Sequence, residues 1–183
     1  MLYIIRHGQT DWNVYRKLQG HTDTTLNAQG KDMAESAAKE CSDIHIDICY
    51  SSPLKRARET AEIILRGRNV PIINDDRLME MGFGSYEGIQ NSFDIPDCPI
   101  NVLFFRPQDY IAPVGGGESL DELFERTGDF LEEKIYPELD KGKDILIVGH
   151  GAMNCSIVSQ IRGYDRADFW KGMTDNCKLV RLI

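Results

Sequence analysis

The chain has 183 residues and a formal net charge of −8, with 42% hydrophobic and 27% charged residues. These proportions are ordinary for a globular protein and exclude a disordered or fibrous chain. The acidic balance argues against nucleic acid or an anionic membrane as the main partner, because both require a basic face.

The length suits one compact domain over residues 1–183. Five cysteines are spread along the chain without a C-x-x-C pair, which predicts reduced thiols rather than a disulfide framework or a zinc site. The opening apolar run stops at Arg6, too early for a signal peptide or a membrane span. We therefore expect a cytoplasmic protein.

In the first half of the chain, short apolar runs predict buried strands over residues 2–5, 46–50 and 70–73. Asn27 is a candidate helix cap, and the apolar residues that follow it have helical spacing as far as Cys41. Ser52 and Pro53 are typical of a cap followed by proline at the first helical position, which predicts a helix through about Leu65.

Residues 85–117 differ from their surroundings, because they contain four prolines and three consecutive glycines without clean periodicity. We interpret them as a long surface excursion that covers the substrate site. A capping box at Ser119 and Glu122 then opens an amphipathic helix. Strands are expected over 144–148 and 179–183, with a helix after Gly151 between them. The alternation predicts a three-layer α/β/α sandwich with a mostly parallel central sheet.

Two of the expected strands end in the same way. The first runs into Arg6-His7-Gly8, and the strand over 144–148 runs into Gly149-His150-Gly151. Because ligands bind beyond the carboxyl ends of strands in open α/β sheets, both histidines should project into one crevice. A lone histidine at a strand end is usually structural, but two His-Gly turns favour a catalytic site.

Arg56 and Glu80 are the next candidates. Arg56 falls in the first turn of the helix predicted after Pro53, where free backbone N–H groups favour an anion, although most arginines are simply solvated. Glu80 lies between Met79 and Met81, so it is either exposed at a turn or desolvated and ready to donate a proton. The sequence leaves these alternatives open.

These residues belong to blocks that resemble the signatures of the histidine phosphatase superfamily, in its phosphoglycerate mutase-like branch. The blocks follow the family order over nearly the whole chain: Arg6–Thr10, Leu18–Asp23 with Leu26, Ser51–Ala57 with Thr60 and Ala61, Leu78–Gly88, Gly116–Ser119 and Val148–Gly151. R-H-G alone is a weak signal, whereas several blocks in order are a strong one.

The resemblance implies a phosphoglycerate mutase-like fold and a role for each matching residue. It makes His7 the phosphorylated nucleophile and Glu80 the general acid. Arg6, Arg56 and His150 would form the phosphate pocket, Asn13 would contact the phosphate, and Thr10 would support the loop; the backbone N–H of Ala152 would be a further donor. Phosphoryl transfer needs mainly positioning and charge neutralisation, which such residues supply, so we expect no metal and no cofactor.

Two departures bear on the function. Residues 152–155 read Ala-Met-Asn-Cys where relatives often have glycine and then an apolar residue followed by arginine. The segment after Gly88 is short compared with that of the mutases, which use a longer insertion to enclose phosphoglycerate. A more open pocket lets water reach the phosphohistidine, so the sequence favours a phosphatase over a 2,3-bisphosphoglycerate-dependent mutase by about three to one.

Other function classes fit less well. An inactive regulatory module on the same fold would lack one of the core residues, and all of them are present. A metallohydrolase would need a ligand set such as H-E-x-x-H, and His21 and His45 are more simply surface residues. The expected partner is a small phosphorylated metabolite. A homodimer is one arrangement that the sequence leaves open, and Phe104, Phe105, Arg106 and Tyr110 either face a ligand or pack in the core.

Overall fold

The computed structural model describes residues 1–115 and 117–183 and contains a five-stranded sheet in the order β3-β2-β4-β1-β5. The strands are β1 (Leu2–Arg6), β2 (Ile48–Ser51), β3 (Ile72–Asn74), β4 (Ile145–Gly149) and β5 (Val180–Arg181). The first four are parallel, and β5 pairs antiparallel with β1 at the edge. The expected, mostly parallel sheet is confirmed.

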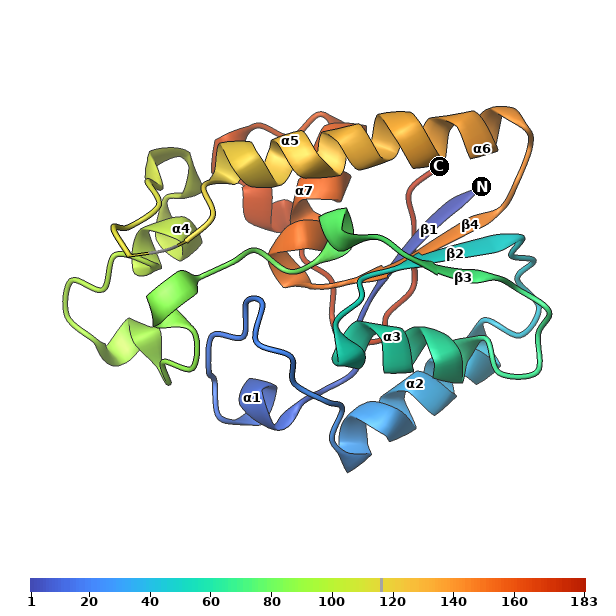
Figure 1. Cartoon of the computed structure of the whole chain (residues 1–183), viewed down its shortest axis with the longest axis horizontal. Helices are drawn as coiled ribbons and strands as arrows, with labels where there is room; N and C mark the ends of the chain where they lie inside the picture. Colours follow the sequence, from blue (N-terminus) through green and yellow to red (C-terminus); the bar gives the residue numbers. More distant parts are fainter. Residues whose placement is uncertain (116) are drawn as a thin grey trace.

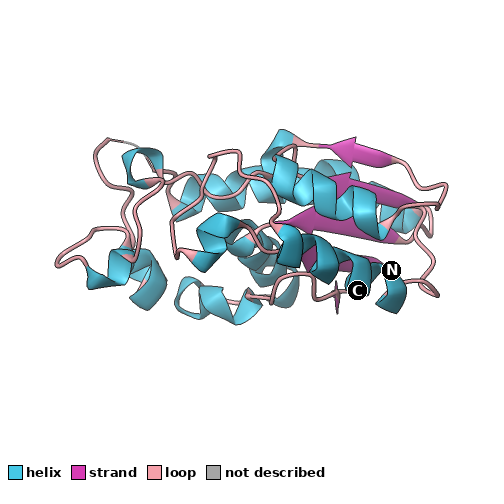
Figure 2. Ribbon diagram, turned by 90° about the horizontal axis from the view of Figure 1, so that it is seen from below, coloured by secondary structure: helices cyan, strands magenta, loops and turns pink. Residues whose placement is uncertain are grey.

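Helices cover both faces of the sheet (Figures 1 and 2). On one face lie α2 (Ala28–Glu40) and α3 (Lys55–Ile64); on the other lie α5 (Leu120–Phe130), the π-helical turn η5 (Leu131–Ile135), α6 (Tyr136–Asp140) and α7 (Gly151–Arg162). Ile4 packs into one core and Ile5 into the other, as successive strand side chains must. The fold is the three-layer α/β/α sandwich expected from the sequence.

Several boundaries differ from the expected ones. The second strand begins at Ile48 instead of residue 46, and just before it the carboxylate of Asp47 accepts a hydrogen bond from Asp144 N–H at 2.7 Å. The third begins at Ile72, after Pro71, which has no N–H to donate to a ladder. The last strand is only Val180–Arg181.

The proposed cap at Ser52 was wrong. Helix α3 begins at Lys55 with Leu54 in the cap position, and the Lys55 N–H donates instead to Asp23 Oδ1 at 2.7 Å. The Ser52 hydroxyl has another contact, because its Oγ lies 2.8 Å from His150 Nε2. Asn27 and Ser119 do cap their helices as expected.

The excursion at 85–117 contains short helical turns and lies beyond the carboxyl ends of the parallel strands (yellow-green in Figure 1). Its elements are η2 (Gly84–Tyr86), η3 (Ser92–Asp94), α4 (Asn101–Phe105) and η4 (Pro107–Asp109). Gly116, in the middle of the glycine run, lies outside the described residues. Tyr110 is buried, whereas Phe105 and Arg106 are exposed. Phe104 is half-buried and lines a cleft at this end of the sheet together with Arg6, His7, Arg56 and Glu80.

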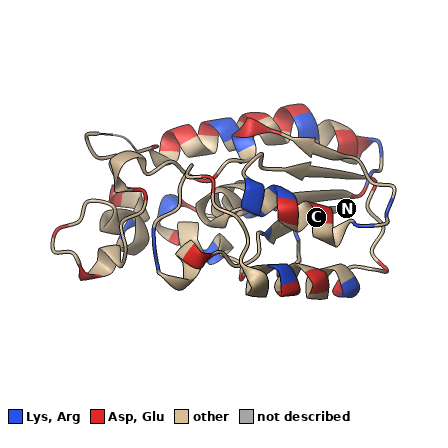
Figure 3. Ribbon diagram, turned by 60° about the horizontal axis from the view of Figure 1, so that its bottom comes forward, with Lys and Arg blue, Asp and Glu red and all other residues tan. Residues whose placement is uncertain are grey.

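The remaining elements are the short helix α1 (Asp11–Val14) and the 3₁₀ helices η1 (Asp76–Leu78) and η6 (Arg166–Gly172). All five cysteines are buried free thiols, as the sequence predicts. In the described part of the chain, no helix combines the length and apolar character needed to cross a bilayer. The outer helices carry interspersed acidic and basic side chains (Figure 3).

Candidate active site

The two His-Gly turns lie side by side at the carboxyl ends of β1 and β4, because these are neighbouring parallel strands. Arg6 pairs in register with Gly149, and His7 N–H donates to the Gly149 carbonyl at 2.9 Å. The ring centroids of His7 and His150 are 5.1 Å apart, and both side chains are buried. The structure thus places the two histidines side by side.

The tautomer of His7 follows from its hydrogen bond. His7 Nδ1 lies 2.7 Å from the Gly8 carbonyl oxygen, which can only accept, so Nδ1 carries the proton and Nε2 holds a lone pair. Burial lowers the pKa of His7 well below its usual value, and the charges of Arg56 and Arg6 lower it further. His7 is therefore neutral at physiological pH and has the form of a nucleophile.

His150 is held in a similar state. Its Nε2 lies 2.8 Å from Ser52 Oγ, and its Nδ1 has no hydrogen-bond partner among the described residues. Burial lowers its pKa well below the usual value, with further contributions from Arg56 and His7. An unpartnered buried ring nitrogen next to His7 is available to a ligand.

The two neutral histidines predict a loss of stability in mild acid. Both pKa values are lowered from 6.5, so just below pH 6.5 the unfolded chain binds protons that the folded chain does not. The free energy of unfolding should therefore fall as the pH falls, by up to about 1.4 kcal/mol per pH unit for each histidine. Thermal melting between about pH 7 and pH 5.5 measures this slope.

The matched control for that slope is His21, which is exposed. His150→Gln should reduce the slope, because one titrating group is removed, whereas His21→Gln should leave it unchanged. Equal slopes in all three proteins would show that His150 is not a source of the slope.

Arg56 is fully buried, which rules out the solvated alternative considered from the sequence. Its two terminal nitrogens donate to the carbonyls of Thr22 and Gly20, both at 2.8 Å, while its Nε has no partner among the described residues. Burial lowers its pKa to about 10, so the guanidinium remains charged at neutral pH. It is a fixed cation beside the two histidines.

Arg6 ends β1 and lies close to Glu80 across Gly151. A Cβ placed on Gly151 would lie 3.8 Å from Arg6 Cζ and 3.4 Å from Glu80 Oε2, so the two side chains flank Gly151 at van der Waals distance. Arg6 Nη1 points to Met173 Sδ at 3.7 Å, and its buried Nε has no partner in the described chain. Its charge is thus free for an anion in the cleft.

Glu80 adopts neither of the two environments weighed from the sequence. It is partly buried, and its carboxylate accepts hydrogen bonds from the first N–H groups of α7: Oε2 from Gly151 at 2.9 Å and Ala152 at 3.3 Å, and Oε1 from Met153 at 3.0 Å. Free N–H groups at a helix start are an anion site. The Glu80 carboxylate occupies this site.

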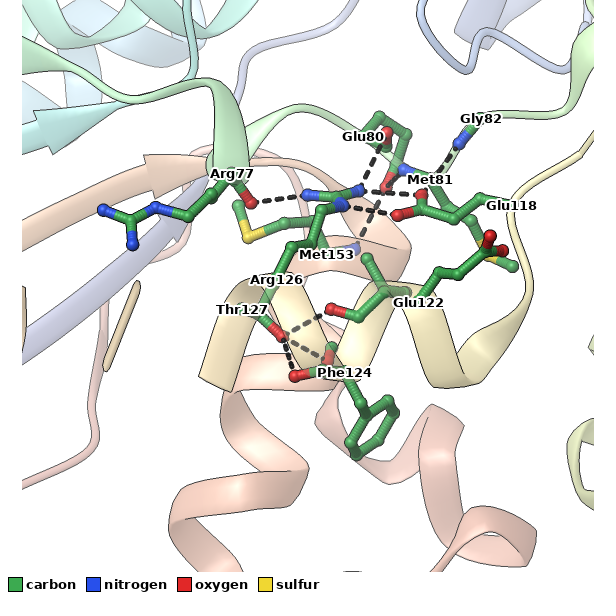
Figure 4. Close-up of polar contacts among 12 residues, drawn as sticks. Arg77, Glu80, Met81, Gly82, Glu118, Glu122, Phe124, Arg126, Thr127 and Met153 are labelled. Carbon is green, nitrogen blue, oxygen red and sulfur yellow. Dashed lines mark hydrogen bonds and ion pairs between the residues drawn. The ribbon is translucent and has the colours of Figure 1, made fainter. Parts of the chain in front are cut away.

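An ion pair between Arg126 and Glu118 fixes the backbone that carries Glu80 (Figure 4). Arg126, on α5, makes two hydrogen bonds to Glu118, and one of them joins Nη2 to Oε2 at 2.8 Å. Arg126 also donates to the carbonyls of Arg77 and Glu80, and Glu118 accepts from Gly82 N–H at 3.2 Å. The pair therefore holds residues 77–82 on both sides of Glu80.

The three remaining candidates lie around this centre. Thr10 is buried and caps α1, where it forms a reciprocal capping box with Asn13. Asn13 Oδ1 accepts from Thr10 N–H at 3.0 Å, which leaves its NH₂ group as the donor facing the cleft that Asn13 lines. Ala152 also lines the cleft, but its N–H is donated to Glu80.

Comparison with known proteins decides the family. The model of the histidine phosphatase superfamily (branch 1) matches residues 2–183. The chain belongs to the histidine phosphatase superfamily. Members of this superfamily are phosphatases or mutases.

Three relatives illustrate the range of this superfamily. The chain is 36% identical over 153 residues to a 2,3-bisphosphoglycerate-dependent phosphoglycerate mutase of Cytophaga hutchinsonii, covering 82% of this chain and 72% of that protein. It is 37% identical over 164 residues to the uncharacterized phosphatase PhoE of Bacillus subtilis, covering 88% and 77%. The solved structure of Bacillus stearothermophilus YhfR superposes with a TM-score of 0.88 at 28% identity, covering 97% of this chain and 88% of that one.

Several residues that support the candidate site were not identified as functional from the sequence. Thr60 accepts from Gly8 N–H at 3.0 Å, and Ser52 contacts His150; both lie inside a family block, which is a signal that was open to use. Asn176 donates to the His7 carbonyl, and Glu118 and Arg126 fix the loop of Glu80. Nothing in the local sequence around Asn176 or Arg126 marks them.

A set of potential metal ligands lies away from this site. Among the described residues, the one group of histidine, cysteine or acidic side chains with suitable spacing is His45, Asp47 and Asp144. Asp47 and Asp144 immediately precede β2 and β4, so they lie at the amino ends of the parallel strands, at the end of the sheet opposite the cleft. Asp144 Oδ1 already accepts from the Met1 ammonium group at 2.8 Å. His21 and His45 are exposed, as expected.

Proposed function

We propose that this histidine phosphatase superfamily member is a phosphatase that hydrolyses a small phosphorylated metabolite of the cytoplasm through a phosphohistidine intermediate, without a metal. One observation carries the proposal: His7 is buried, neutral and held by the Gly8 carbonyl with Nε2 free, next to two arginines and a second histidine. Such a nitrogen is a nucleophile, and its surroundings suit a phosphate dianion.

The phosphate would bind among Arg6, Arg56 and His150, with the Asn13 amide as a further donor. Two fixed guanidinium groups neutralise the equatorial oxygens, and arginine's planar fork suits phosphate geometry. A bound dianion would favour protonation of His150, whose Nδ1 is unpartnered. The phosphate would also compete with Glu80 for the N–H groups of Gly151 and Ala152.

In the first step, His7 Nε2 attacks phosphorus, the bond to the ester oxygen breaks, and Glu80 gives its proton to that oxygen. The step requires that Glu80 carry a proton when the substrate is bound. In the second step, water attacks phospho-His7, Glu80 takes a proton from the water, and the P–N bond breaks to release inorganic phosphate. The imidazole returns to its starting state.

A 2,3-bisphosphoglycerate-dependent mutase is the second candidate, because a relative with that name is 36% identical. The short segment after Gly88 favours hydrolysis, since it leaves the phosphohistidine open to water. An assay of phosphoglycerates with and without 2,3-bisphosphoglycerate separates the two. Isomerisation that depends on the bisphosphate would replace the phosphatase proposal with the mutase.

Trapping the intermediate tests the chemistry directly. Brief incubation with a ³²P-labelled phosphomonoester, followed by denaturation, should give a protein label that is lost in acid and retained in alkali, because a phosphoramidate has that lability. His7→Gln should take up no label. Label that survives acid would point to a different nucleophile.

A further inference from the structure

A second hollow opens from the catalytic cleft on the side of the excursion. The two share Arg6, Lys17, Leu18 and Phe104 in their walls, so they form one continuous depression. Beyond the shared residues the hollow is lined by two backbone segments: Arg16 comes from the loop after α1, and residues 91–94 come from the start of the excursion. A group attached to a phosphate in the cleft would extend into this space.

The two segments are fixed to each other. Asn91 N–H donates to the Arg16 carbonyl at 3.0 Å, and Leu18 N–H donates to the Ile89 carbonyl at 3.0 Å. Arg16 and Asn91 both have left-handed backbone conformations, with φ of 51° and 50°. For arginine this conformation is costly and persists only where surrounding contacts impose it. The backbone of this wall is therefore held in a defined shape, and it carries the neighbouring residues Arg16 and Lys17.

The hollow has more positive charge than the phosphate requires. In the described part of the chain, neither Arg16 nor Lys17 is within 4 Å of a carboxylate; Lys17 Nζ instead lies over the Trp12 ring, 5.4 Å from its centroid. Three cationic side chains line the hollow against one carboxylate, Asp94, although the whole chain has a net charge of −8. Arg6 and Arg56 serve the phosphate, which leaves Arg16 and Lys17 without a counter-ion.

Two aromatic side chains, Phe93 and Phe104, also line the hollow. The Phe104 ring stacks on Trp170, with centroids 5.2 Å apart and planes 16° apart, and Trp170 Nε1 donates to the Leu103 carbonyl at 2.7 Å. Phe93 packs edge-on against Phe104 at 5.2 Å, yet its side chain is 58% exposed. An exposed phenylalanine supported by a fixed aromatic pair offers a surface for a flat apolar group.

We propose that this hollow is the leaving-group subsite and that it selects phosphomonoesters whose leaving group carries a ring and a second anionic group. The ring lies against Phe93 and Phe104, and the anion pairs with Arg16 and Lys17. This assignment rests on the proposed phosphatase function, because it takes the cleft as the phosphate site. It adds the chemical class of substrate, which the family alone leaves open.

Stable phosphonates measure the subsite without interference from leaving-group reactivity. The inhibition constant is measured for 3- and 4-carboxybenzylphosphonate and for the corresponding carbamoylbenzylphosphonates, against turnover of p-nitrophenyl phosphate. The amide has the shape of the carboxylate but no charge. Of the 3- and 4-carboxybenzyl compounds, the one that binds more tightly should have an inhibition constant about tenfold lower than that of its own amide. This ratio corresponds to about 1.4 kcal/mol.

The variants Arg16→Gln and Lys17→Met should each reduce this ratio, and together they should bring it to about one. Lys39→Met is the matched control, because Lys39 is an exposed lysine at the end of α2, and it should leave the ratio unchanged. The ring is tested with 5-carboxypentylphosphonate, which should bind more weakly than the carboxybenzyl compound. Phe93→Ala should remove most of that difference.

The outcomes separate the two proposals. A carboxylate-to-amide ratio near one in the unaltered protein, with p-nitrophenyl phosphate still hydrolysed, would overturn the subsite and leave the phosphatase intact. A ratio that survives in the double variant would place the anion elsewhere and overturn the role of Arg16 and Lys17. Absence of p-nitrophenyl phosphate hydrolysis would instead contradict the proposed function.

Discussion

Replacing His7 with Gln should lower kcat for p-nitrophenyl phosphate by at least about 10³-fold, because removal of a covalent nucleophile leaves only binding and electrostatic stabilisation. The buried thiols of the cysteines offer no comparable nucleophile, and the proposal assigns His150, whose Nε2 contacts Ser52, to binding the phosphate. Burial raises the pKa values of Cys49, Cys155 and Cys177, which keeps these thiols protonated. Steady-state release of p-nitrophenol measures the loss.

Two controls accompany this variant. His45→Gln removes an exposed histidine at the end of the sheet opposite the cleft and should retain full activity. Thermal melting at neutral pH should show that His7→Gln remains folded, since Gln can still donate toward the Gly8 carbonyl. A chelator should leave the activity of the unaltered protein intact. Residual activity of His7→Gln within tenfold of the original would contradict the role of His7.

The sequence predicted the sheet more reliably than it predicted the ends of its strands. Buried parallel strands are continuous apolar runs, so 2–5 and 144–148 were recognisable, and their positions at the centre of the sheet follow from that composition. The ends depend on single contacts from remote residues. At the start of α3, for example, Asp23 accepts from the Lys55 N–H in place of Ser52. Such long-range partners leave no periodic signal.

The candidate site divides in the same way. Residues that follow a strand directly, such as His7 and His150, were placed by topology alone. The environment of Glu80 was not predictable, because it depends on the helix start at Gly151, which is distant in sequence, and on Arg126 in another helix. Local composition around Glu80 suggested either exposure or desolvation. Neither describes a carboxylate bound to the N–H groups of a helix terminus.

Replacing Glu80 with Gln should slow phosphoryl transfer from alkyl phosphates far more than from aryl phosphates. An alkoxide leaves poorly without a proton, so kcat/KM for an alkyl phosphate should fall by about 10²- to 10⁴-fold, the usual contribution of a general acid. A nitrophenolate hardly needs a proton, so kcat/KM for p-nitrophenyl phosphate should fall by less than about tenfold. The comparison uses kcat/KM because that quantity reports the steps up to formation of phospho-His7.

The second half of the reaction gives an independent signature. In the proposed reaction Glu80 also activates the water that hydrolyses phospho-His7, so Glu80→Gln should accumulate the phosphoenzyme and release a burst of p-nitrophenol before a slow steady state. A variant with a merely weakened phosphate site would show no burst. Equal losses for alkyl and aryl substrates would remove Glu80 from the acid role.

The clamp that holds Glu80 extends the same prediction to residues outside the cleft. Glu118→Gln weakens the pair with Arg126 and so loosens residues 77–82, which should reduce the ratio of alkyl to aryl kcat/KM by about tenfold, since small displacements of a catalytic group are costly. Glu122→Gln is the matched control, because Glu122 caps α5 through Ser119 without contacting that loop. It should leave the ratio unchanged. If Glu118→Gln lowered kcat/KM equally for the alkyl and the aryl substrate, the ion pair would serve stability alone. The position of Glu80 would then be fixed by the α7 N–H groups.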